Sequence, residues 1–475
     1  MEIKDFIQIE KKYDLYHLEV DGVQPWMYYR MEFWNYRLCK NILALSDALS
    51  KPNRLKDYVN QLKSVFSLVM RGNRKQICEA DMVFYAHSRR IKVKEHYECI
   101  YTDRLAGKYS RNVVIENSFR NRHLTPVQTE HLYYTDLIQF KAALYSYLHR
   151  IIKTRRYKNI YAQIKDNFAV PLEEIESIYH YTEPFHDVCK ALTRIVLKNQ
   201  ILKNELDKIL RKIRPKIIIE VVYYNKRCML LNELAKEKGI LTVELQHGTM
   251  HGVHAAYQFA DECGEIKQFP DYVFVFSEYW KRCANLPIPA ERVKVTGYPF
   301  FEEQLYKYNA DKNGEITNII FVSQGTIGME LSRLAADVSE LLDESKFHII
   351  YKLHPGEYNG WKDRNPWLIK DNIEVVDSLE HNIYEYFAKC DIQVGVYSTA
   401  IYEGLGFGLM TYIYNVGHAD TMKELCEQGY AIYVNGAEEL CAHISSMDMS
   451  GNKETKEFWK MNSFENICRE IDQLL

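Results

Sequence analysis

The residues best suited to chemistry gather in one stretch of the chain, Gln246 to His254, which holds three histidines and two glycines. The stretch follows an apolar run, Ile240 to Leu245, that is typical of a buried β-strand. Ligands of α/β proteins bind beyond the carboxyl ends of the strands, so a loop in this position can present side chains to a substrate. An imidazole titrates near neutral pH, and His247 is therefore a candidate general base for an acceptor hydroxyl.

The loop also offers residues for chemistry other than general-base catalysis. His247, His251 and His254 have a spacing that could suit zinc, but Gly248 and Gly252 oppose a continuous helix and no fourth ligand is apparent. No Asp-x-Asp pair is present to clamp a metal-bound diphosphate, so no metal is expected. Four carboxylates are alternative bases, each with a structural role as the competing interpretation: Asp103, Glu116, Glu220 and Glu244.

The acceptor side of the site is expected to take residues from this loop and from earlier strand ends. Short apolar runs at 82–86, 97–101 and 112–115 indicate the first strands of an open sheet, and each is followed by polar residues. Arginines after the first run could meet an anionic acceptor. The predicted acceptor-side residues are Gln246, His254, Tyr257, Arg89, with Arg90 beside it, and Asp103.

The second half of the chain holds three polar loops, each after an apolar run. Glycine and small polar residues let backbone N–H groups approach an anion, and a following helix N-terminus adds its dipole. Ser398 or Thr399 is a natural N-cap, whereas Glu403 is out of place for a capping box and is predicted to reach ribose hydroxyls. The predicted nucleotide-binding residues are Ser323, Gln324, Gly325, Thr326, Lys352, His354, Pro355, Ser398, Thr399 and Glu403.

Strands and helices alternate in both halves of the chain, which predicts an α/β protein with two Rossmann-like domains facing across a cleft and extra N-terminal helices. The expected divisions are an acceptor-binding domain at 1–305, with a helical insertion at about 128–215, a nucleotide-binding domain at 316–450, and a helical tail at 451–475 that packs back on the first domain. Neither first strand is followed by G-x-G-x-x-G, which disfavours a nicotinamide dinucleotide.

Composition and net charge exclude two classes of protein. Apolar residues make up 47% and charged residues 26%, which excludes a largely disordered chain, and a net charge of −3 excludes whole-molecule attraction to nucleic acid. Eleven cysteines without a C-x-x-C pair favour free thiols in a reducing compartment. No signal peptide or apolar run of membrane-spanning length is apparent, so a cytoplasmic location is expected.

Two basic segments, 140–158 and 198–216, are predicted helices within the insertion, and a further helix is predicted at 46–70. A cationic helix can rest on anionic lipid or present a solvated face, and the sequence leaves both interpretations open. The first interpretation would place the protein peripherally on the cytoplasmic face of the inner membrane.

Several of these motifs together resemble those of bacterial GT-B glycosyltransferases of capsule and lipopolysaccharide synthesis. They are Gln246-His247-Gly248-Thr249, Gly297-Tyr298-Pro299, His354-Pro355, and Ser398-Thr399 with Glu403, within residues 216–435. The His-Gly-Thr loop is similar to that of the CDP-glycerol glycerophosphotransferases. The His-Pro and Ser-Thr pairs resemble those that hold the phosphate and ribose of a CMP-sugar in sialyltransferases and Kdo transferases.

The sequence also departs from these families. Gln246 stands where the glycerophosphotransferases usually have tryptophan, and the acidic motif that supplies the base in sialyltransferases is not recognisable. The assignment of His247 as base therefore depends on the glycerophosphotransferase resemblance alone.

The resemblance implies a metal-independent, inverting GT-B glycosyltransferase that needs no cofactor. It would move a sugar from a nucleotide donor, a CMP-sugar in preference to a UDP-sugar, to a bacterial surface polysaccharide, lipopolysaccharide or lipid-linked glycan. Three alternatives stay open: a CDP-polyol phosphotransferase of the same fold, a sugar-nucleotide epimerase, and a catalytically inactive glycan-binding scaffold.

Overall fold

The first sheet consists of short strands that are buried along nearly their whole length. The computed structural model describes residues 3–39, 77–88, 90–118, 122–180, 184–308, 316–378, 380–446 and 456–475. Seven parallel strands lie in the order β5-β4-β1-β6-β7-β8-β9. They are β1 (Met82–Tyr85), β4 (Asn112–Glu116), β5 (Leu132–Tyr134), β6 (Ile217–Val221), β7 (Leu241–Leu245), β8 (Tyr272–Val275) and β9 (Val293–Val295). Their continuous apolar runs fit a parallel sheet covered on both faces.

The second sheet has six parallel strands in the order β12-β11-β10-β13-β14-β15. They are β10 (Thr317–Val322), β11 (Phe347–Lys352), β12 (Ile373–Val376), β13 (Ile392–Gly395), β14 (Met410–Tyr414) and β15 (Ile432–Val434). In both sheets the strand order reverses next to the first strand, between β1 and β6 and between β10 and β13. Ligands of doubly wound sheets bind at the carboxyl ends of the strands beside such a switch point.

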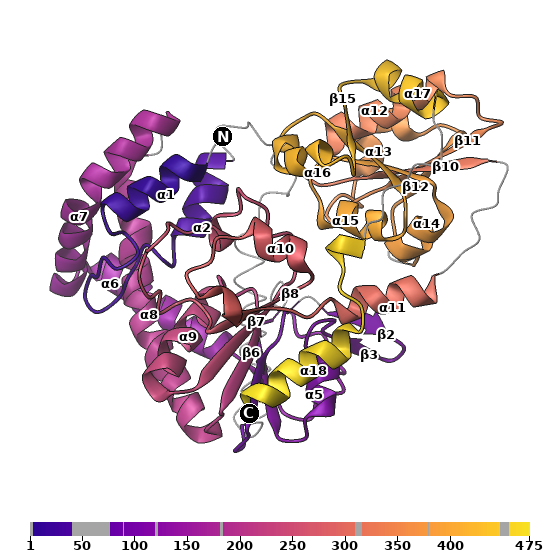
Figure 1. The fold of residues 1–475 in the computed structure, drawn as a ribbon. Coiled ribbons are helices and arrows are strands. Elements are labelled where there is room, and N and C mark those ends of the chain that lie inside the picture. Colours follow the sequence, from indigo (N-terminus) through magenta and orange to yellow (C-terminus); the bar gives the residue numbers. More distant parts are fainter. Residues whose placement is uncertain are drawn as a thin grey trace.

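The molecule has two lobes, and each lobe is one of the sheets with the helices that cover it (Figure 1). The first lobe carries α1 (Ile3–Lys12), α2 (Arg30–Glu32), α5 (Asp103–Lys108), α9 (Lys226–Lys238), α10 (Glu278–Cys283) and α11 (Pro299–Lys307). Its flank, at the left of Figure 1, is formed by α6 (Asp136–Ile152), α7 (Arg155–Tyr179) and α8 (Phe185–Ile213). The second lobe carries α12 (Gly328–Leu341), α13 (Trp361–Arg364), α14 (Ile383–Lys389), α15 (Thr399–Gly406), α16 (Lys423–Glu427) and α17 (Ala437–Ser445).

The C-terminal segment returns from the second lobe to the first. Helix α18 (Ser463–Leu474) packs its apolar side chains against the first sheet (Figure 1). Gly297 permits this crossing, because its φ of +99° suits glycine and a Cβ atom there would lie 2.2 Å from the Lys460 carbonyl oxygen. The close packing of the C-terminal segment therefore requires glycine at the position before Tyr298.

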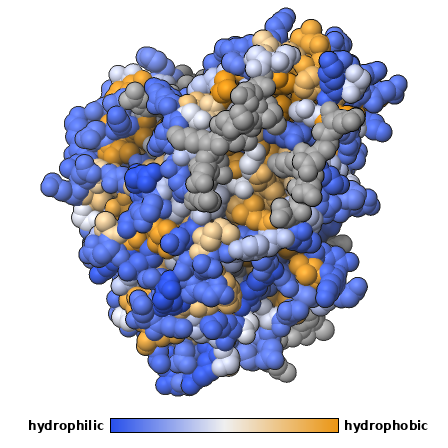
Figure 2. Space-filling model, turned by 45° about the vertical axis from the view of Figure 1, so that its right-hand side comes forward, coloured by the Kyte–Doolittle hydropathy of each residue, from blue (hydrophilic) through white to orange (hydrophobic). Residues whose placement is uncertain are grey.

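A continuous cluster of buried apolar residues joins the two lobes. At the junction, Trp459 packs on Phe301 with ring centroids 4.1 Å apart, and the Tyr279 and Tyr402 hydroxyls lie 3.3 Å apart. The face shown in Figure 2 is mostly hydrophilic, with hydrophobic residues in smaller patches. Among the described residues, no helix is long and apolar enough to cross a membrane.

The structure differs from the sequence prediction at several elements. The run 97–101 was expected in the main sheet, but β3 (His96–Glu98) forms a separate antiparallel pair with β2 (Ile91–Val93). The short strands β5 and β12 were not predicted. The helix expected at 140–158 is interrupted, because Lys153 takes a left-handed conformation and Thr154 caps a new helix. The helix expected at 46–70 lies outside the described residues.

Candidate functional site

Two side chains from neighbouring strand ends of the first sheet lie near His247. His247 follows β7, Tyr224 follows β6 and His87 follows β1, so the last two flank the switch point of the sheet. The Tyr224 hydroxyl and His247 Nε2 are hydrogen-bonded at 3.1 Å. Burial, with His87 nearby, lowers the pKa of His247 to about 3, and the imidazole is therefore neutral.

Hydrogen bonds from Gln246 and Tyr101 fix the conformation of the loop that carries His247. The Gln246 side chain donates to the Gly248 carbonyl at 2.7 Å and accepts from the Phe276 N–H at 2.7 Å. The Tyr101 hydroxyl donates to the His247 carbonyl at 2.9 Å. Gln246, predicted on the acceptor side, is thus buried and stabilises the conformation of the loop through these two hydrogen bonds.

The N-terminal helices fix the continuation of this loop. Arg30 is buried in an ion pair with Glu10 at 2.7 Å and donates to the carbonyls of Ala255 and Gln258. The Trp34 indole donates to the Val253 carbonyl at 3.1 Å. The bonds from Arg30 and Trp34 to these carbonyls join segments more than 200 residues apart in the sequence, and they fix the backbone around His254.

His251 and His254 complete a ring cluster beside His247. Their ring centroids are 5.7 Å apart, and His254 lies 5.5 Å from the Tyr224 ring. Burial lowers the pKa of both imidazoles to about 3; for His251, His254 and then His418 of the second lobe also lower the pKa, and Asp420 opposes them. The Nδ1 atoms of all three histidines lack a hydrogen-bond partner among the described residues.

The loops at the switch point of the second sheet are joined to each other by hydrogen bonds. Gln324 donates to the Tyr397 carbonyl at 2.9 Å and accepts from the Tyr397 N–H at 3.0 Å, which joins the loops after β10 and β13. The Thr326 and Tyr397 hydroxyls are also hydrogen-bonded. Ser398 caps α15 by accepting from the Ala400 N–H at 3.2 Å.

The loop after β7 meets the switch point of the second sheet at Gly248 and Thr399. A Cβ atom placed on Gly248 would lie 3.4 Å from the Thr399 hydroxyl oxygen, so the loop of His247 touches the first turn of α15. Helix N-termini present free N–H groups and a positive dipole end, and they attract phosphate. The arrangement therefore places the loop that carries His247 next to a potential anion site.

The other predicted donor residues fall into two groups. His354 and Pro355 are exposed after β11; His354 Nδ1 accepts from the Gly356 N–H at 3.1 Å. Ser323 and Lys352 are instead buried and hydrogen-bonded within the lobe. Ser323 accepts from the Tyr351 hydroxyl, and Lys352 donates to the Tyr358 hydroxyl and the Ser378 carbonyl. Gly325 lies in the same turn as Gln324, half-buried.

Glu403 lies one turn into α15 and accepts from the Tyr384 hydroxyl at 3.0 Å. Burial raises its pKa to about 7. Tyr298, from the Gly-Tyr-Pro segment, lies near enough for Glu403 and Tyr101 to raise the pKa of its hydroxyl, after the larger effect of burial. A set of phenols therefore connects the His247 loop to Glu403.

Several residues predicted for the acceptor side have structural partners instead. Tyr257 is fully buried and donates to Glu244 at 2.8 Å, so it offers no surface to an acceptor. Asp103 and Glu116 both pair with the buried Arg90, and Arg89 lies outside the described residues. His254 stays with the His247 cluster, and the Tyr257 ring packs on it from below the surface, with ring centroids 5.0 Å apart.

The alternative carboxylate bases have structural partners. Glu220 and Glu244 are neighbours in register on β6 and β7, and burial raises their pKa values to about 8 and 7. Asn232 donates to Glu220 at 2.8 Å, and the Tyr223 N–H donates to Glu244 at 3.0 Å. These acids belong to the interior of the lobe.

The sequence prediction missed His87 and Tyr224 as partners of His247. Both follow directly after a strand, and that position was the available signal. Val222, two residues before Tyr224, has a φ of +65°, which is strained for a β-branched residue. Backbone strain of this kind often accompanies a functional strand end.

No protein-family model matches the chain, and no curated protein matches it in sequence. Solved structures match its fold. The UDP-GlcNAc 2-epimerase of Methanocaldococcus jannaschii covers 82% of this chain and 99% of its own, with 12% identity and a TM-score of 0.50. A wall teichoic acid polymerase covers 89% and 98%, with 11% identity and a TM-score of 0.44. A UGT transferase from Siraitia grosvenorii covers 83% and 99%, with 12% identity and a TM-score of 0.43.

These similarities concern the fold. Two doubly wound parallel sheets in tandem, matched over nearly the full length of the epimerase, confirm the predicted GT-B architecture. The chain is a GT-B-type α/β protein.

Proposed function

We propose that this protein is a GT-B glycosyltransferase that moves a sugar from a nucleotide donor to a glycan or lipid-linked glycan acceptor. Residues 1–305 would form the acceptor lobe, residues 316–450 the donor lobe, and the helical tail at 451–475 would pack back on the acceptor lobe. The observation that carries the proposal is the close approach of Gly248, the residue after His247, to Thr399 at the N-terminus of α15. A base beside a phosphate site is the arrangement that inverting transfer requires.

The donor would be held by its nucleotide. The leaving phosphate would lie at the N-terminus of α15, where Ser398, Thr399 and backbone N–H groups can neutralise the charge that develops in the transition state. His354 is exposed in the adjacent loop and can contribute a further donor. Glu403 would bind ribose hydroxyls. The proposal favours a CMP-sugar, with a UDP-sugar as the second donor class.

His247 would take the proton of the acceptor hydroxyl. In the empty site its pKa is about 3, so the imidazole is in the form that accepts a proton but is a weak base. A negatively charged donor favours the protonated form and raises the pKa towards neutrality. His247 would thus become an effective base only when the donor binds, and this would limit hydrolysis of the donor.

The test is transfer by a His247→Gln variant, whose amide cannot take the proton. Donors activated with CMP, CDP and UDP are incubated with glycan acceptor, and nucleotide release and product are measured. Loss of the general base is expected to lower turnover by about 10²–10⁴-fold while nucleotide affinity is retained. His381→Gln is the matched control, because His381 is exposed on the second lobe.

The remaining outcomes contradict the proposal in distinguishable ways. Unchanged turnover in His247→Gln would remove His247 from the reaction. Conversion of the donor sugar without acceptor would identify an epimerase, and transfer of a polyol phosphate from a CDP donor would identify a phosphotransferase. We also propose that no metal takes part, so chelation by EDTA is expected to leave the rate unchanged.

A further inference from the structure

Helix α6 carries an apolar stripe that faces solvent. Leu144, Tyr147, Leu148, Ile151 and Ile152 have between 46% and 68% of their surface exposed. Their spacing of three and four residues places them on one side of the helix. Scattered exposed apolar residues are normal on a protein surface, but five within nine residues form a contiguous patch.

The opposite side of α6 is already occupied. Ile138, Ala142 and Ser146 are buried, and the helix packs against α8. The exposed stripe is thus a second apolar side, which the folding of this lobe does not require. Figure 1 shows α6 within the helical flank, while the second lobe lies on the other side of the molecule.

Basic residues border this stripe. Residues 137–165 contain seven lysines and arginines and no aspartate or glutamate, although the whole chain has a net charge of −3. Four of these cations are exposed and form no ion pair within the described part of the chain: Arg150, Lys153, Arg155 and Lys158.

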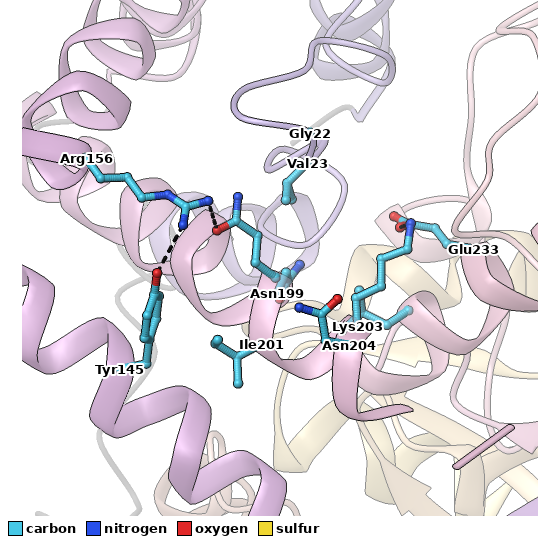
Figure 3. Close-up of a pocket in the computed structure, with 11 residues that line it drawn as sticks. Gly22, Val23, Tyr145, Arg156, Asn199, Ile201, Lys203, Asn204 and Glu233 are labelled. Atoms are coloured by element: carbon cyan, nitrogen blue, oxygen red, sulfur yellow. Dashed lines mark hydrogen bonds and ion pairs between the residues drawn. The ribbon is translucent and has the colours of Figure 1, made fainter. Parts of the chain in front are cut away.

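Two other cations of this segment have structural partners. Arg156 lines a pocket of about 340 Å³, where it donates to Tyr145 and Gln200 (Figure 3) and pairs with Asp21. Lys141 pairs with Glu205. The charge along the end of α6 and the start of α7 is therefore available to an external partner.

We propose that this face, formed by residues 144–158 at the end of α6 and the start of α7, lies on an anionic lipid bilayer. Apolar side chains over two helical turns would enter the boundary of the acyl chains, and the adjoining lysines and arginines would meet the lipid headgroups. A bilayer suits both features at once, since it offers an extended apolar layer beneath a negatively charged surface. The inference does not depend on the proposed transfer reaction.

The test is flotation of the full chain with vesicles of phosphatidylcholine alone or with 30% phosphatidylglycerol, a probe composition chosen for its negative charge. Binding is expected to the anionic vesicles and to fall with added salt. Lys153→Gln with Arg155→Gln is expected to weaken binding by about 25-fold, since each cation near the surface contributes roughly fivefold. Leu148→Glu with Ile152→Glu is expected to abolish it.

Ile369→Glu is the matched control, because Ile369 is 60% exposed on the second lobe. It is expected to bind as the wild type does, and melting curves verify that every variant is folded. Equal binding to neutral and anionic vesicles, or unchanged binding of the α6 variants, would overturn the proposal. A dimer in light scattering that Leu148→Glu with Ile152→Glu converts to monomer would also overturn it, because a second copy would then cover this face.

Discussion

Replacement of Glu403 by glutamine is expected to make the stability of the protein less dependent on pH. Burial raises the pKa of Glu403 from its ordinary value of 4.5 to about 7. Between these values the folded protein keeps a proton that the unfolded chain has released, so this group lowers stability as the pH rises through this window. The loss saturates above the folded-state pKa.

The size of the effect follows from the shift. Each pKa unit corresponds to about 1.4 kcal/mol, so the buried carboxylate lowers the free energy of unfolding by about 1 kcal/mol at pH 5 and about 3 kcal/mol at pH 8. Glutamine keeps the shape and can still accept from Tyr384, but it cannot ionise. The stability of Glu403→Gln relative to the wild type is therefore expected to rise by about 2 kcal/mol between pH 5 and pH 8.

The assay is urea unfolding of both proteins at several pH values in this range. Other buried acids titrate in both proteins and cancel in the difference. Glu330→Gln, an exposed residue on α12, serves as the control and is expected to show no pH-dependent difference. If the Glu403→Gln difference is the same at pH 5 and pH 8, the carboxylate is not held in the protonated form and the reasoning fails.

Three further substitutions test particular contacts. Gly297→Ala is expected to destabilise the protein by about 2–4 kcal/mol in thermal melts, because its φ of +99° and the neighbouring Lys460 carbonyl leave no room for a Cβ atom; a loss below about 0.5 kcal/mol would contradict this. Arg90→Met leaves two buried carboxylates unpaired and is expected to cost about 3–5 kcal/mol at pH 8; a neutral effect in urea unfolding would show that they are not ionised. Tyr224→Phe removes one hydrogen bond from His247, worth about 1 kcal/mol, so turnover is expected to fall about fivefold with nucleotide affinity unchanged. A Tyr224→Phe enzyme with full turnover would mean that this bond does not position the imidazole.

The strands that border the site could be predicted because each combines a buried apolar run with a polar exit. The run 240–245 contains β7, and the runs before Ser323 and Ser398 contain β10 and β13. Short edge strands lack this signal. β5 has only three residues, and β12 includes an exposed glutamate, Glu374, so neither differs from loop sequence by local pattern.

Other features depend on contacts between distant parts of the chain. The helix ends at Lys153 through a left-handed conformation that lysine does not favour locally. Nothing in the local sequence of Asp103 reveals that Arg90 pairs with it, and nothing at Gly248 reveals that Thr399 lies beside it. Sequence reasoning therefore found the loops of the candidate site, whereas their pairing across the two lobes required the structure.

The measurement that tests the central claim most directly is nucleotide binding to the N-terminus of α15. Melting is recorded with CMP, CDP, UMP and UDP for the wild type, for Thr399→Val, and for Thr317→Val at the amino end of β10. At about 100 times its dissociation constant, a bound nucleotide is expected to add about 2.7 kcal/mol of stability to the wild type and to Thr317→Val, and much less to Thr399→Val. If no nucleotide stabilises the wild type, or if all three proteins respond alike, the site at Gly248 and Thr399 does not hold a nucleotide donor.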